Sequence, residues 1–133
     1  MSTIKANTLL AANGSSTTPP SIPALDTRFA TAWVLFDGVA VSGTSAAPIG
    51  RSYNVSSITD IATGRYYVNF TNAMNTDKYV TVSSGLSTAN GTNRNASAAP
   101  FDTSKCYVNT TITSTGSSND IAFISLLVFG GQA

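Results

Sequence analysis

The chain has 133 residues, of which 42% are hydrophobic and 10% charged, and its formal net charge is +1 with no histidine. This length and apolar content suit one domain with a core of ordinary size. The scattered charges offer no basic stripe for nucleic acid, and the lack of histidine excludes His-based triads and histidine metal sites.

Hydroxyl and amide side chains dominate the polar part of the sequence. It contains 19 Thr, 18 Ser and 11 Asn but no Glu. Thr favours strands, whereas Ser and Asn favour turns. The composition therefore predicts an all-β protein, an antiparallel β-sandwich or jelly-roll-like domain over residues 31–133, preceded by an extended N-terminal arm over residues 1–30.

The first thirty residues have the composition of an arm. Residues 13–23, NGSSTTPPSIP, form a Gly, Ser, Thr and Pro cluster that favours polyproline-like extension. Several apolar side chains of the arm have no local strand partner: Ile4, Leu9, Leu10, Ile22 and Leu25. We therefore expect the arm to attach to a neighbouring subunit or to another protein, with a disordered tail as the alternative.

The first predicted strand covers residues 31–36. Trp33 and Leu35 alternate with Val34 and Phe36, so both faces of this strand are expected to be covered. Residues 39–50 are rich in Gly, Ala and Ser and contain Pro48, which favours a loop or a short edge strand.

Residues 52–70 predict a β-hairpin. Tyr53 and Val55 alternate with polar residues, and Tyr66, Val68 and Phe70 do the same after a turn. Gly64 can supply the positive φ that such a turn usually needs. A further strand is expected over residues 78–83.

Residues 84–104 show almost no periodicity and are expected to form a loop of about twenty residues, a length that is often functional. The next strand covers residues 105–113, with Cys106 as a buried small side chain, and a turn on Gly116 follows. The loop and this turn give the candidate receptor surface, a solvated loop being the alternative: Asn90, Asn93, Arg94, Asn95, Ser117 and Asn119.

The last strand, residues 121–129, is apolar on both sides. One side carries Ile121, Phe123, Leu127 and Phe129, and we expect it to face the core of the domain. A partner subunit would then cover the other side, and the expected oligomer interface is Ala122, Ile124, Leu126 and Val128.

Four segments in a fixed order resemble the β-domain at the C-terminal end of many bacteriophage tail-fibre proteins. They are TAWVLFDG around Trp33, RSYNVSSITDIATGRYYVNFTNAM, DKYVTVSSG and a closing VFG, and the match covers roughly residues 30–84. The resemblance implies a virion fibre component made in the host cytoplasm, usually a homotrimer with a host-recognition surface. Tail or capsid proteins are the partners it suggests, and exposed Tyr together with Asn and Ser suits a host surface glycan. About thirty residues precede Trp33, so a receptor-binding tip and a short structural fibre both stay open.

No motif in the sequence indicates a cofactor, a metal or a catalytic site. The acidic residues are Asp26, Asp37, Asp60, Asp77, Asp102 and Asp120, and their neighbours favour turns rather than an acid–base pair. We therefore expect no enzyme. No apolar run is long enough for a membrane helix, and the N-terminus lacks the pattern of a secretory signal. Three hypotheses follow: a host-adsorbing fibre, a purely structural capsid or tail decoration protein, and a disfavoured depolymerising enzyme.

Overall fold

The computed structural model describes residues 29–40, 49–87 and 94–131, and these contain strands but no helix. The strands are β1 Ala30–Phe36, β2 Ile49–Tyr53, β3 Val55–Ala62, β4 Arg65–Phe70, β5 Tyr79–Leu86, β6 Arg94–Pro100, β7 Lys105–Ile112 and β8 Phe123–Gly130. The apolar residues predicted to attach the arm, Ile4 to Leu25, lie outside the described residues, as do Asn90 and Asn93.

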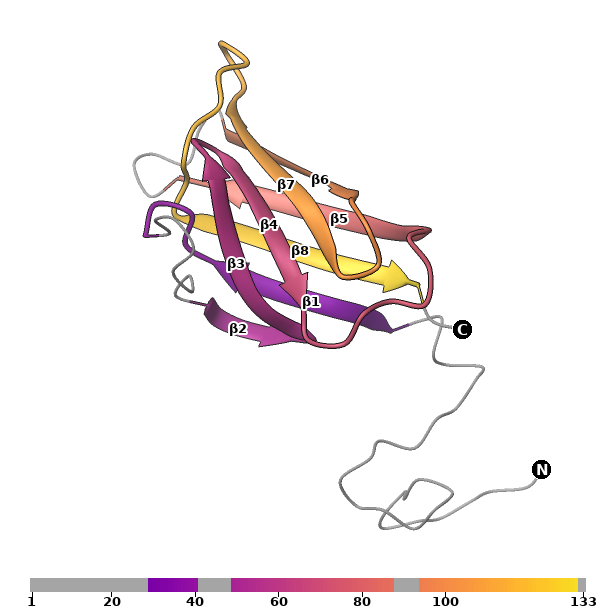
Figure 1. Ribbon diagram of the computed structural model, residues 1–133. Coiled ribbons are helices and arrows are strands. Elements are labelled where there is room, and N and C mark those ends of the chain that lie inside the picture. Colours follow the sequence, from indigo (N-terminus) through magenta and orange to yellow (C-terminus); the bar gives the residue numbers. More distant parts are fainter. Residues whose placement is uncertain (1–28, 41–48, 88–93, 132–133) are drawn as a thin grey trace, which may run out of the picture.

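Two four-stranded antiparallel sheets pack face to face (Figure 1). Sheet A has the strand order β2-β1-β8-β5, and sheet B has the order β3-β4-β7-β6. The predicted all-β sandwich is confirmed. Because the chain crosses repeatedly between the sheets, each sheet combines segments that are far apart in the sequence.

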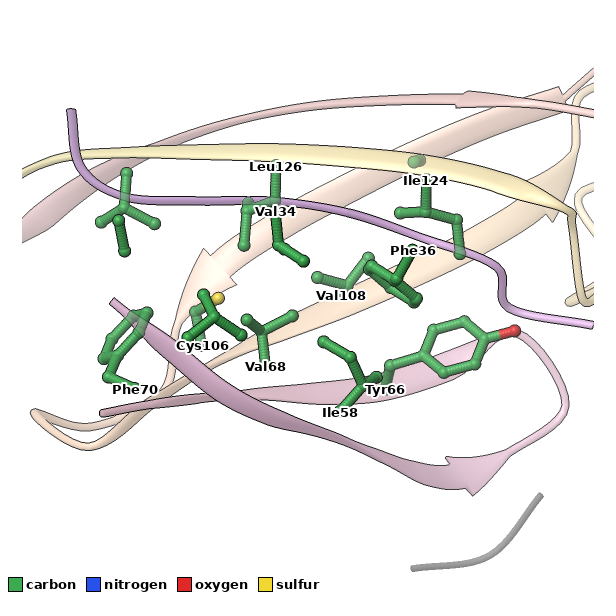
Figure 2. Packing of buried hydrophobic residues seen from close by; sticks show 14 of the residues in the cluster. Val34, Phe36, Ile58, Tyr66, Val68, Phe70, Cys106, Val108, Ile124 and Leu126 are labelled. Atoms are coloured by element: carbon green, nitrogen blue, oxygen red, sulfur yellow. The ribbon is translucent and has the colours of Figure 1, made fainter. Parts of the chain in front are cut away.

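The core lies between the sheets and consists of the inward side chains of both. Figure 2 shows side chains of β1 and β8, such as Phe36 and Leu126, pointing toward Val68 of β4 and Val108 of β7. Each of these four side chains is at most 2% exposed. Burial of such a side chain contributes about 1.5–3 kcal/mol, so the packing of these strands stabilises the sandwich. Cys106 is also fully buried here, as predicted.

The predicted hairpin is divided at Asn54. This residue has a φ of 54°, and it separates edge strand β2 of sheet A from edge strand β3 of sheet B. Its side-chain amide donates to the carbonyls of Thr31 and Asn72, while its oxygen accepts from the Asn72 N–H. Asn tolerates the left-handed region because its short amide can bond locally. Tyr53 and Val55 consequently belong to different sheets, whereas Gly64 forms the expected turn with a φ of 68°.

The long loop predicted over residues 84–104 is wrong for most of those of its residues that the structure describes. Strand β5 continues to Leu86, and Arg94–Pro100 forms β6 against β7. Ser83 and Thr81 of β5 donate to the carbonyls of Ala96 and Ala98 in β6, at 2.9 and 2.8 Å. The inward residues of β6 are small alanines, so its pattern lacks the large apolar residues by which strands are usually predicted.

The side of β8 that faces the core is the opposite of the one expected. Ile124, Leu126 and Val128 are buried between the sheets, and Ala122 lies half-buried just before the strand. Phe123 and Leu127 point outward instead. The predicted oligomer interface of Ala122, Ile124, Leu126 and Val128 is therefore corrected. The alternation of residues identified the two faces of this strand, but it did not indicate which face packs against the core.

The sandwich has two distinct ends. Thr31, Asn75 and Gly131 lie at the end where the described chain begins and finishes, since Thr31 Oγ1 donates to Gly130 O and Asn75 N–H to Gly131 O. The turns at Gly64 and Gly116 lie at the other end, which we call the distal end (Figure 1).

Candidate interaction surface

The outer face of sheet A is unusually apolar for a surface that one subunit leaves open. A row of four residues crosses all four strands, because Tyr53 pairs with Trp33, Trp33 with Leu127, and Leu127 with Val82. Directly paired residues in antiparallel strands point to the same side. The four side chains are 54%, 38%, 38% and 53% exposed in that order.

Further rows extend this surface along the strands. Phe123 pairs with Leu86 toward the distal end, and Val80 pairs with Phe129 toward the other end. Ser84 and Ser125 form a polar pair in the middle. We call the exposed set the apolar face; its members are Trp33, Leu35, Tyr53, Val80, Val82, Leu86, Phe123 and Leu127.

The size of the apolar face separates it from ordinary surface exposure. Eight large side chains, each about half exposed, leave roughly 600–800 Å² of apolar area in contact with solvent. The largest patch on a typical monomer is about 300–600 Å², while a standard protein interface buries about 800 Å² per partner. The apolar face therefore has the area of an interface.

An apolar hollow adjoins the distal part of this face. It has a volume of about 130 Å³ and is lined by Leu35, Phe36, Asp37, Gly50, Ala122 and Phe123. A hollow of this kind can accept one side chain from a docked surface, which adds shape to an otherwise flat sheet. The prediction that both faces of β1 are covered is wrong within one subunit, because Trp33 and Leu35 remain exposed beside the hollow.

The predicted receptor residues that the structure describes gather at the distal end. Arg94 and Asn95 begin β6, and Asn95 pairs with Thr111 of β7. Thr111 also forms an isolated bridge with Ser118, so the turn that contains Ser117 and Asn119 lies close by. Arg94 and Asn95 are therefore close to the turn in the fold, although they are more than twenty residues away in the sequence.

The turn before β8 is held by a partly buried hydrogen-bond network. Asp120 Oδ1 accepts from Tyr66 Oη at 2.7 Å and from the Gly64 N–H at 2.6 Å. Thr110 Oγ1 donates to Asn119 O at 2.6 Å. Burial of the Tyr66 phenol, together with the Asp120 carboxylate, raises its pKa well above the usual range. These groups bond to one another, and their hydrogen bonds hold the distal turn in position.

Other kinds of site find little support in the described residues. Asp37 and Asp102 accept hydrogen bonds from backbone N–H groups two residues on, as turn-forming aspartates do. In the part of the chain that the structure describes, no three Cys or Asp side chains gather as metal ligands. No helix among the described residues could cross a membrane.

No family model, curated protein or solved structure matches this chain. Inference about its function therefore depends on its own surfaces. The apolar face is an extended one among the described residues, and the sequence contained a signal for part of it. Trp33, Leu35 and Leu127 lie in strands whose inward neighbours are also apolar, which predicts cover on both sides.

Proposed function

We propose that the protein is a homotrimeric component of a bacteriophage virion fibre, whose subunits associate through the apolar face and present their distal ends for host recognition. The observation that carries this proposal is the row of Tyr53, Trp33, Leu127 and Val82 across the whole of sheet A. A row of this kind costs solubility in a lone subunit and stabilises a complex of subunits.

A second copy is the favoured occupant because of the area and composition of the face. The exposed apolar area is close to what each partner contributes to a standard interface. Aromatic residues are enriched at interfaces, and the face contains Trp33 on the central strand β1 and Tyr53 beside it on the edge strand β2. The number of three subunits comes from the resemblance to fibre domains, because an apolar sheet face indicates association but not the number of subunits.

The two ends of the sandwich support the proposed orientation in a fibre. The chain enters β1 at Ala30, so the preceding arm starts at the end of the sandwich that holds Thr31 and Gly131. Strands of eight residues, about 26 Å long, separate that end from the distal surface of Asn95 and Ser117. An arm that attaches to the virion would therefore leave the distal surface pointing outward.

The mass of the protein in solution tests the assembly. Three chains of 13.7 kDa give about 41 kDa by light scattering. Trp33→Asp and Val82→Asp should each release folded monomers, because each would place a charge within the apolar face that the partner covers. Ile61→Asp is the matched control: Ile61 is an exposed apolar residue at the end of β3 in sheet B, and its variant should remain trimeric.

Fluorescence gives a second reading of the same event. Trp33 is the only tryptophan, so its emission should shift to longer wavelength when the trimer dissociates. A wild-type protein that stays monomeric or dimeric over micromolar to millimolar concentrations would overturn the trimer. Adsorption to host cells tests recognition separately, and a trimer that does not adsorb but is required for particle assembly would be a structural decoration protein.

A further inference from the structure

The outer face of sheet B has a different chemistry from the apolar face. Tyr67 of β4 pairs with Tyr107 of β7, and these two tyrosines form its central row. The row on one side pairs Arg65 with Asn109, and the row on the other pairs Asn69 with Lys105. Each side of the tyrosine pair thus carries one cation and one amide. We call these six residues, together with Phe101, the aromatic face.

The rings of the aromatic face lie close together at the surface. The Tyr67 centroid is 4.7 Å from that of Phe101 and 6.2 Å from that of Tyr107. Phe101 remains 53% exposed although it packs on Tyr67. Ala99 is the residue opposite Tyr107 in β6, and its small side chain leaves this ring uncovered on that side. The result is an aromatic platform open to solvent.

The cation of Lys105 is held on this platform. Its Nζ lies 5.0 Å from the Tyr67 centroid and 5.2 Å from the Phe101 centroid, within the range of a cation–π interaction. It also lies 3.6 Å from Asp102 Oδ2. Arg65 is exposed, and no ion pair of Arg65 occurs within the described part of the chain. Two cations against one carboxylate leave the face positive.

Amides and hydroxyls flank the rings. Asn69 Nδ2 donates to Ser57 Oγ and Thr59 Oγ1, both at 3.0 Å, which fixes its orientation beside Tyr67. The side-chain oxygen of Asn109 is buried and accepts no hydrogen bond. This oxygen is closed to solvent, so Asn109 would meet a ligand only through its amide nitrogen. Side-chain amides and hydroxyls of this kind both donate and accept hydrogen bonds, as sugar hydroxyls require.

We infer that the aromatic face binds an acidic carbohydrate. The C–H edges of a sugar ring carry partial positive charge and pack against the negative faces of aromatic rings, here Phe101 and Tyr107. The side-chain oxygen of Asn69 and the amide nitrogen of Asn109 would bond its hydroxyls, and its carboxylate would pair with Lys105 or Arg65. Positive charge on the protein and negative charge on the ligand make the two complementary.

This inference rests on the proposed host recognition and names its ligand class. It adds a binding site on sheet B to the distal surface. It is compatible with assembly through the apolar face, since the two faces lie on opposite sides of the sandwich (Figure 1). A trimer that buries sheet A would leave sheet B on the outside. Loss of assembly and loss of sugar binding are therefore separate outcomes.

Titration of the full chain with trigalacturonic acid and with 3′-sialyllactose tests the inference, with neutral maltotriose as the comparison. Calorimetry measures affinity, and amide NMR shifts locate the site, which should map to β4 and β7. Phe101→Ala and Lys105→Gln should weaken binding of the acidic sugar by about tenfold or more. Lys78→Gln is the matched control, because it removes the same charge from an exposed lysine before β5, outside this face.

Three results would overturn the inference. These are no saturable binding of either acidic sugar by the wild-type protein, equal binding of maltotriose, and unchanged affinity in the Phe101 and Lys105 variants. Thermal melts of each variant show whether it is folded. Tyr107→Phe keeps the ring and should retain most of the affinity, whereas Tyr107→Ala should not, so a general loss of folding can be told from a lost contact.

Discussion

Leu126 and Leu127 are adjacent, identical residues that the fold places on opposite faces of β8, so the same substitution at each should have different outcomes. Leu126 is 1% exposed and points between the sheets, while Leu127 is 38% exposed on the outer face of sheet A. Removal of a buried leucine side chain costs about 2–5 kcal/mol. An unpaired carboxylate left in the core adds several kcal/mol more.

These costs can be compared with the stability of the domain. Roughly ninety ordered residues correspond to a free energy of unfolding of about 5–13 kcal/mol. Leu126→Asp should therefore leave the chain largely unfolded. Leu127→Asp loses only part of one side chain's burial, about 1–2 kcal/mol, and its carboxylate reaches water. It should fold but remain monomeric.

Circular dichroism and amide NMR spectra show whether each variant is folded, and size-exclusion chromatography with light scattering shows its assembly. Leu126→Asn and Leu127→Asn are matched controls that introduce polarity without charge, and they should follow the same order with smaller effects. A folded Leu126→Asp protein, or a Leu127→Asp protein that unfolds, would show that the facing of β8 described above is wrong.

The free energy of unfolding should fall as pH rises above about 9. Burial raises the pKa of both Tyr79 and Cys106 to about 12, and it raises the pKa of Tyr66 further, so the folded state holds protons that the unfolded state releases. The three groups contribute their full stabilisation at a pH below their ordinary pKa values, and this stabilisation is lost as the pH approaches their pKa values in the folded state. The midpoints of urea unfolding from pH 8 to 11 measure this loss. In Tyr66→Phe the free energy of unfolding should fall less steeply with pH. Gly64→Ala should destabilise more than Gly116→Ala, although φ is 68° and 69° at the two positions. Both substitutions add the strain of about 1–2 kcal/mol for a positive φ. Only at Gly64 would the added Cβ meet backbone atoms, the nearest at 2.5 Å. Equal urea unfolding midpoints for the two alanine variants would therefore contradict the packing of this turn.

The sequence alone determined the fold class and most of the strands. Period-two alternation located β1, β4, β7 and β8 to within a few residues, and the turns at Gly64 and Gly116 followed from their glycines. These signals are local, because the period of side chains along a strand and the φ of a turn depend on neighbouring residues. The candidate surface was partly predictable in the same way, through strands that are apolar on both sides.

Only the tertiary structure decided which side of each strand faces inward. Leu126 and Leu127 are equally apolar, and their difference arises from the sheet that packs over one of them. Strand β6 likewise exists through its pairing with β7 and the hydrogen bonds from Thr81 and Ser83, which no local pattern contains. The aromatic face has the same origin: Tyr67 and Tyr107 are forty residues apart and become neighbours only when β4 pairs with β7. Non-local pairing decided these features because a strand specifies the spacing of its side chains but not its partners.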